Sequence, residues 1–106
     1  IPVCFDAKEC AVDTFSLQNI HPHQVEFMQD FEKQDGIAFF LLYYTSRDVM
    51  YYLRLDELMI YWNRMKQGGR KSFRYEELDP EYFLPEVSGV LVPYLNALQK
   101  DLASRD

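Results

Sequence analysis

The sequence predicts a single α/β domain with a small mixed β-sheet flanked by helices. Its 106 residues fit one domain, and an apolar content of 48% is enough for a hydrophobic core. The apolar patterns follow one another as strand, helix, strand, strand, helix, short strand and helix. A short turn joins the second and third strands and makes them antiparallel, so a purely parallel sheet is excluded.

The first strand and the first helix are predicted from the N-terminal third of the chain. The apolar run at residues 1–5 indicates a buried, central strand that ends near Lys8. Residues 9–20 show no helical periodicity and are expected to be irregular. Pro22 fits the first turn of a helix. The apolar face of this helix consists of Val25, Met28 and Phe31, with Phe27 nearby.

The middle of the chain predicts a β-hairpin. Asp35-Gly36 ends the first helix, and residues 37–44 form a continuous apolar and aromatic run. Such a run is typical of a central strand that is buried on both faces. Residues 45–48 read as a turn, and residues 49–55 as the antiparallel partner strand.

Two further helices and one short strand are predicted after the hairpin. Asp56 is the expected N-cap of the second helix, and Gly68-Gly69 ends it. Its apolar positions at helical spacing are Leu58, Tyr61, Trp62 and Met65. Residues 70–79 are polar and partly basic, and Pro85 confines a strand at 82–87 to the edge of the sheet. Pro93 opens the last helix, whose apolar positions are Leu95, Leu98 and Leu102.

Composition restricts the class of protein. Eight Tyr and eight Phe predict a core rich in aromatic side chains. No apolar window is long enough to span a bilayer, and no secretory signal is visible. Cys4 and Cys10 match no zinc-binding spacing, so we expect free thiols and a cytoplasmic location. Because Ile1 is not a methionine and lies inside a predicted strand, we expect further residues upstream of it.

The net charge of −6 argues against a strongly basic nucleic-acid-binding protein. It does not exclude a nuclease, because bound metal ions supply positive charge at such a site.

The end of the first strand carries the most specific chemical pattern, Asp6-Ala7-Lys8. Side chains alternate along a strand, so Asp6 and Lys8 point to the same face while Glu9 points away and is expected to be structural. A carboxylate can hold a divalent metal, and an ammonium group can lie beside an attacking water or a phosphate. This is the chemistry of a metal-dependent nuclease. The alternative from the spacing alone is an exposed ion pair.

Three further segments strengthen the nuclease interpretation. The chain contains Phe5-Asp6-Ala7-Lys8-Glu9, then the run from Ser16 to Gln24 with its His-Pro-His-Gln sequence, then Gly69-Arg70-Lys71-Ser72-Phe73, and finally Pro93-Tyr94-Leu95. These motifs resemble, in order and over nearly the whole chain, those of the RecU-type Holliday junction resolvases.

The resemblance implies a restriction-endonuclease-like fold with an Asp…acidic-x-Lys active site. It further implies a homodimer that nicks two strands of a four-way junction with Mg²⁺ or Mn²⁺. Asp6 stands where the family usually has a glutamate, and Lys8 matches its lysine. The family's other metal-binding aspartate, an acidic helix and a junction-probing stalk would all lie upstream of Ile1. Residues 9–14 also lack the expected basic residues and are about one residue shorter.

Asp6 and Lys8 are the candidate catalytic residues. Asp6 would ligate the metal, and Lys8 would orient the nucleophile or stabilise charge on the phosphate. Gln18 and Gln24 are candidates for contact with DNA phosphates or a metal-bound water. The alternative for both is an amide that caps a helix or forms an internal hydrogen bond.

Two more pairs of side chains are candidate DNA contacts. His21 and His23 lie at a helix start, which is a natural phosphate site, although helix capping and backbone contact is the favoured interpretation of both. Arg70 and Lys71 belong to the only basic cluster of an acidic chain. They could bind the DNA backbone, or they could be the ordinary positive charge at a helix C-terminus.

Three functions remain open at this point. The first is a structure-selective, metal-dependent endonuclease that resolves four-way DNA junctions during recombination and repair. The second is a catalytically inactive nuclease-like module that binds DNA or a recombination protein. The third is a small domain in which the motif matches are accidental.

Overall fold

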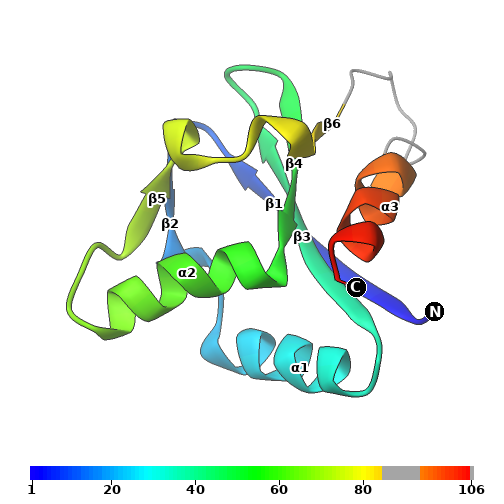
Figure 1. Ribbon diagram of the computed structural model, residues 1–106. Coiled ribbons are helices and arrows are strands. Elements are labelled where there is room, and N and C mark those ends of the chain that lie inside the picture. Colours follow the sequence, from blue (N-terminus) through cyan, green and yellow to red (C-terminus); the bar gives the residue numbers. More distant parts are fainter. Residues whose placement is uncertain (85–93, 106) are drawn as a thin grey trace.

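A computed structural model describes residues 1–84 and 94–105 and contains one mixed sheet with helices on both faces (Figure 1). The strand order is β1-β3-β4-β6, with bounds Val3–Cys10, Ile37–Tyr44, Val49–Arg54 and Phe83–Leu84. β1 pairs with β3 in parallel, and β4 is antiparallel to both β3 and β6. The predicted mixed α/β fold is confirmed.

Three helices cover the two faces of this sheet. They are α1 (Pro22–Lys33), α2 (Leu55–Lys66) and α3 (Tyr94–Ser104). Tyr51 and Tyr52 are neighbours on β4 and therefore point to opposite faces. The Tyr51 hydroxyl donates to Glu57 of α2, whereas the Tyr52 hydroxyl donates to Asp101 of α3. α2 and α3 consequently pack on opposite faces.

The register places the side chains of Asp6 and Lys8 on the face covered by α2. Lys8 pairs with Leu42, and Leu42 pairs with Tyr51, so these three side chains share one face. Asp6 lies two residues before Lys8 and has the same orientation. The side chain of Gln24, in the first turn of α1, reaches Asp6 on this face. α1 and α2 therefore lie on one side of the sheet.

The core is built from large aromatic side chains, as the composition predicts. On the α3 face, aromatic rings stack across three strands. The centroids of Phe5 and Phe39 are 5.3 Å apart, and those of Phe39 and Tyr52 are 4.2 Å apart. The aromatic side chains that are almost fully buried are Phe15, Phe39, Phe40, Tyr44, Tyr51, Tyr52 and Phe73. β3 matches its predicted bounds and is buried along nearly its whole length.

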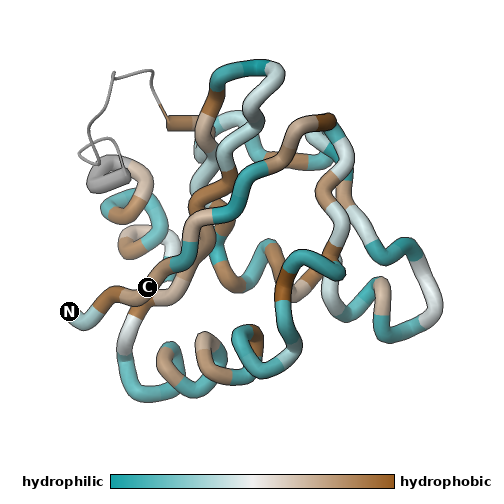
Figure 2. Tube along the Cα trace, turned by 180° about the vertical axis from the view of Figure 1, so that it is seen from behind, coloured by the Kyte–Doolittle hydropathy of each residue, from teal (hydrophilic) through white to brown (hydrophobic). Residues whose placement is uncertain are grey.

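The prediction of a buried central first strand is wrong. Among the described residues, β1 pairs only with β3 and is an edge strand. Its odd-numbered side chains are exposed, including Phe5 at 42%, and its even-numbered side chains are more covered. The hydropathy trace shows the polar middle of β1 on the rear of the molecule, above α1 (Figure 2). An apolar run therefore does not distinguish a central strand from an edge strand with one exposed face.

The prediction that residues 9–20 are irregular is also wrong. They contain β2 (Thr14–Ser16) and a short 3-10 helix (Leu17–Asn19). β2 pairs with β5 (Ser72–Arg74) in a separate two-stranded sheet, so part of the polar segment at 70–79 is a strand. Strands this short lack a clear periodicity, and their pairing joins segments that are distant in the sequence.

Helix boundaries are close to the predictions, with two differences. α1 starts at Pro22 and buries Val25 and Met28, but Phe27 is 59% exposed and does not belong to the apolar face. The N-cap of α2 is Arg54 rather than Asp56, because β4 passes directly into the helix. Asp56 lies within the first turn, where its carboxylate accepts the backbone N–H of Glu57.

The C-terminal predictions are tested only in part. β6 is a two-residue edge strand within the predicted 82–87 segment. Residues 85–93, including Pro85 and Pro93, lie outside the described residues. α3 is present, with Leu98 and Leu102 packed against the core. Among the helices of the described residues, none has both the length and the hydrophobicity needed to cross a membrane.

A tight glycine turn ends α2 and leads into the basic segment. Gly68 has φ 90°, and its N–H donates to the carbonyl of Met65 at 3.0 Å. The N–H of Gly69 donates to the carbonyl of Arg64 at 2.8 Å. These two bonds form a Schellman motif, which satisfies the last carbonyl groups of the helix.

We expect Gly69→Ala to lower the free energy of unfolding by about 1–2 kcal/mol. A Cβ at Gly69 would lie 2.7 Å from the Arg64 carbonyl oxygen, so the turn would have to shift. Urea unfolding followed by circular dichroism measures the change. Gln67→Ala is the control, because Gln67 is exposed and lies only two residues before Gly69. Equal stability of the two variants would contradict the prediction.

Candidate active site

The centre of the candidate site is the pair Asp6 and Lys8 on the covered face of β1. The Lys8 ammonium lies 2.9 Å from Asp6 Oδ2. The side chain of Lys8 is 25% exposed and that of Asp6 is 39% exposed, so both groups remain accessible to solvent. The prediction that the two side chains share a face is confirmed. The contact is also the ion pair that the spacing allowed as an alternative, so it does not assign a catalytic role.

A third side chain completes this group. Gln24 Nε2 donates to Asp6 Oδ2 at 2.8 Å and joins the start of α1 to β1. Partial burial raises the pKa of Asp6, but the hydrogen bonds from Lys8 and Gln24 outweigh it, so the pKa lies below its ordinary value. The carboxylate is therefore ionised at neutral pH. It can act as an oxygen ligand for a divalent cation.

The two histidines lie at the start of α1 beside Gln24. His21 is the N-cap, and its Nδ1 accepts the backbone N–H of His23 at 3.1 Å. The two rings stack with centroids 4.9 Å apart, and His23 Nδ1 lies 3.6 Å from Glu26. The capping interpretation is confirmed for His21. The exposed imidazole of His23 is available to a ligand.

The glycine turn after α2 approaches the segment before α1. The backbone N–H of Leu17 donates to the Lys71 carbonyl oxygen at 2.9 Å. Gln18 follows Leu17, and its side chain is exposed. The structure thus places Lys71 beside the segment that leads to His21, although 54 residues separate Leu17 from Lys71 in the sequence.

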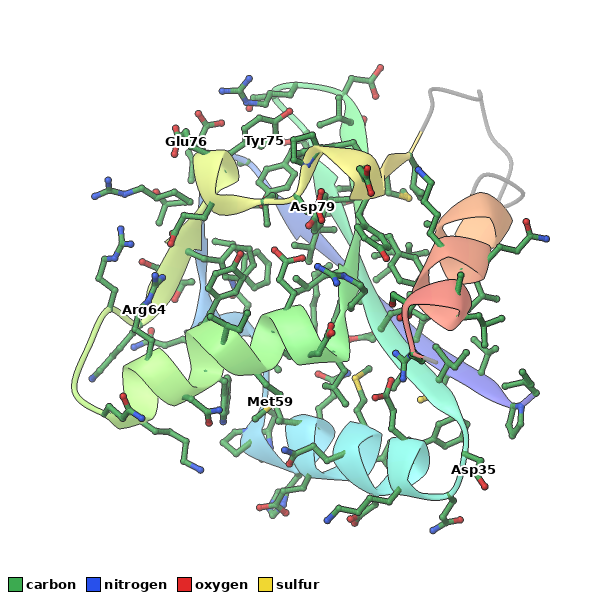
Figure 3. All side chains as sticks on the ribbon, viewed as in Figure 1. Asp35, Met59, Arg64, Tyr75, Glu76 and Asp79 are labelled. Carbon is green, nitrogen blue, oxygen red and sulfur yellow. The ribbon has the colours of Figure 1, made fainter. Side chains whose placement is uncertain are left out.

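The basic cluster is partly neutralised. Glu77 accepts Arg64 at 2.7 Å and Arg70 at 3.3 Å, which lowers its own pKa, with the Arg64 hydrogen bond as the largest cause. Figure 3 shows Arg64 beside β5, where it also donates to the Ser72 carbonyl oxygen. Arg70 therefore has an internal partner. Lys71 is exposed, and no ion pair of its ammonium is seen among residues 1–84 and 94–105. Of these two candidate DNA contacts, Lys71 is the more available.

Sequence analysis missed a buried glutamate on the same face of the sheet. Glu57 is 5% exposed, and it accepts the hydroxyl groups of Tyr51 at 2.5 Å and Tyr61 at 2.6 Å. Burial raises its pKa above the ordinary range and outweighs the opposing effect of the two hydroxyls and of Arg54. The sequence contained one sign of this contact. Glu57 lies four residues before Tyr61 in the predicted helix, and residues at this spacing are neighbours on one helix face.

The side chains at this site include an oxygen ligand that suits a divalent metal ion. Mg²⁺ is commonly held by one or two carboxylates together with water and substrate phosphate oxygens. Asp6 supplies one such carboxylate. Within the described residues, no group of three or more His, Cys, Asp or Glu side chains is placed to hold a metal. Cys4 and Cys10 are free thiols, as predicted.

Comparison with known proteins decides the family. The family model for RecU, recombination protein U, matches residues 1–100. The chain belongs to the RecU family. A RecU protein of Limosilactobacillus reuteri (strain DSM 20016), named Holliday junction resolvase, is 37% identical over 103 residues, which is 95% of this chain and 50% of the relative. The RecU protein of Bacillus subtilis (strain 168), of the same name, is 43% identical over 76 residues, which is 71% of this chain and 36% of the relative.

The matches also show how much of the length of its relatives this chain covers. It spans about half the length of the curated relatives that it matches. The family match covers β1, with Asp6 and Lys8, and α1, with Gln24. It also covers Arg70 and Lys71 after the glycine turn.

Proposed function

We propose that this protein is a metal-dependent, structure-selective endonuclease that resolves four-way DNA junctions during recombination and repair. The observation that supports it most directly is the convergence of Asp6, Lys8 and Gln24 in a chain of the RecU family. Relatives of this family are named Holliday junction resolvases. Because the chain spans half their length, the activity of the whole protein is proposed for it.

The chemistry that we assign to the site is phosphodiester hydrolysis. A bound Mg²⁺ or Mn²⁺ would activate water and polarise the scissile phosphate. Asp6 would hold the cation through a carboxylate that is ionised at neutral pH. Lys8 lies beside this carboxylate, and its positive charge would stabilise the additional negative charge of the phosphate in the transition state.

We propose that residues from three neighbouring segments contact the DNA backbone. They are Gln18, His21, His23, Arg70 and Lys71. The amide of Gln24, the remaining candidate, donates to Asp6 instead. The exposed side chains of His23 and Lys71 suit contact with phosphate oxygens. Such contacts orient the DNA without reading its sequence, as a junction-selective enzyme requires. The proposal includes a cytoplasmic homodimer, since two symmetric nicks need two sites, and possible recombination proteins as partners.

The proposal predicts cleavage of a four-way junction in the presence of Mg²⁺ or Mn²⁺. A linear duplex with the same arm sequences should be cut at least tenfold more slowly, and EDTA should stop cleavage. Labelled strands on a denaturing gel measure the nicks. Equal cutting of junction and duplex, or cutting in EDTA, would contradict the proposal.

A second function, binding without catalysis, is favoured by two observations. Asp6 is the single acidic side chain in direct contact with Lys8 among the described residues, and the chain has a net charge of −6. A nuclease-like module without catalysis would bind the junction but not cut it. Binding without any nick, at every metal concentration tested, would support this second function.

A further inference from the structure

One oxygen of the Asp6 carboxylate receives two donors from different elements. Lys8 Nζ lies 2.9 Å from Oδ2, and Gln24 Nε2 lies 2.8 Å from the same atom. Lys8 belongs to β1, whereas Gln24 lies 18 residues from Asp6 in the first turn of α1. No other side chain in the described part of the molecule donates to this carboxylate, and the backbone N–H of Ala7 makes a further, weaker hydrogen bond with it. Oδ1 is thus the oxygen that the side-chain donors leave for a cation.

Gln24 is well placed to hold this orientation. Its helix starts at Pro22 and is capped by His21, and it is anchored in the core by Val25 and Met28. The side chain of Gln24 is itself half-buried. A primary amide can donate to a carboxylate without adding a charge. Because the donor is neutral, its hydrogen bond to Oδ2 does not repel a cation bound to Oδ1.

We propose that Gln24 is a positioning residue for the metal-binding carboxylate. By holding Oδ2 it fixes the rotation of the Asp6 side chain, so that Oδ1 is presented to the metal. It also joins the carboxylate to the start of α1, where His21 and His23 lie. This inference rests on the proposed nuclease function, and it gives the Nε2 group of Gln24 a role other than direct contact with DNA.

The test is Gln24→Met, which keeps the length of the side chain and removes the donor. Partners that orient metal ligands typically contribute 10- to 100-fold to metal affinity or activity. We expect Mn²⁺, titrated without DNA and followed by electron paramagnetic resonance, to bind about tenfold or more weakly. In single-turnover cleavage we expect a similar fall in the maximal rate and an unchanged half-saturating junction concentration.

Gln29→Met is the matched control. Gln29 lies on the same helix, is also half-buried, and donates to Met59 Sδ at 3.7 Å rather than to the site. The same chemical change at Gln29 should leave Mn²⁺ affinity and the cleavage rate within twofold of the unmodified protein. If Gln24→Met does not fold, nuclear magnetic resonance of the unmodified protein provides the test instead. It follows the signals of the Gln24 side-chain NH₂ group. They should shift when Mg²⁺ is added or when Asp6 is changed to Asn.

Three results would overturn the inference. Mn²⁺ affinity and cleavage in Gln24→Met that equal those of Gln29→Met would exclude a positioning role. A rise in the half-saturating DNA concentration at an unchanged maximal rate would assign Gln24 to DNA contact instead. If the unmodified protein binds no Mn²⁺ and cuts no junction, the nuclease function fails together with the inference. Failure of Gln24→Met alone leaves the nuclease function intact.

Discussion

Asp6→Asn is expected to abolish junction cleavage and to leave junction binding and the fold intact. The substitution preserves the shape of the side chain and removes the negative charge that would hold the cation. The stabilisation that a positioned metal gives to a phosphoryl transition state is several kcal/mol. Its loss corresponds to a rate decrease of about a thousandfold.

The measurement compares labelled junction cleavage in Mg²⁺ with junction binding in EDTA. Asp13→Asn is the matched control, because Asp13 also contacts a cationic side chain, Arg47, at 2.7 Å. It should cut at the normal rate. Lys8→Met should also lose cleavage but retain metal binding, since it leaves the carboxylate in place. Normal cutting by both Asp6→Asn and Lys8→Met would reject the proposed active site.

Glu57→Ala is expected to cause the largest loss of stability, about 3 kcal/mol. The carboxylate accepts two buried hydroxyl groups, from Tyr51 and Tyr61, and its removal leaves their O–H donors with poorer partners. The backbone N–H of Asp79 also donates to the Tyr51 hydroxyl, so the network connects β4, α2 and the segment before β6. Loss of one member disturbs all three elements.

Chemical denaturation monitored by circular dichroism measures this loss. Glu57→Gln keeps an acceptor and should be destabilised by only about 1 kcal/mol. Glu81→Ala changes an exposed glutamate and should remain within about 0.5 kcal/mol of the unmodified protein. A change of less than about 0.5 kcal/mol in Glu57→Ala would show that the network does not stabilise the fold.

The raised pKa of Glu57 gives this prediction a pH dependence. Burial is the largest cause of the shift and disfavours the ionised form in the folded state. The folded protein therefore retains the proton to a higher pH than the unfolded chain does. The stability that Glu57 contributes is complete below the ordinary glutamate range and is lost as the pH rises through the raised pKa. The stability difference between the unmodified protein and Glu57→Gln should shrink over this window.

Patterns within one segment were sufficient for the longer elements. β3 has its predicted bounds, because a run of eight apolar or aromatic residues between two turns has the length and composition of a strand buried on both faces. α1 starts at Pro22, whose fixed φ suits the first helical position. The same-face geometry of Asp6 and Lys8 follows from the period of a strand and needed no tertiary information.

Pairings between distant segments could not be derived in this way. β2 is three residues long and exists because β5, more than fifty residues later, lies beside it. The edge position of β1 depends on which strands pair with it, and an apolar run gives no such information. The N-cap of α2 is Arg54 and not the predicted Asp56, because β4 continues directly into the helix.

The sequence by itself determined the mixed α/β class, the motifs of the RecU family and the shared face of Asp6 and Lys8. Each of these depends on residue identity and on the local period of the backbone. Only the tertiary structure brought Gln24 to Asp6, paired Arg70 with Glu77, and buried Glu57 between two tyrosines. These contacts join different elements, and their geometry is set by how the helices and the small sheet pack against β1, β3 and β4.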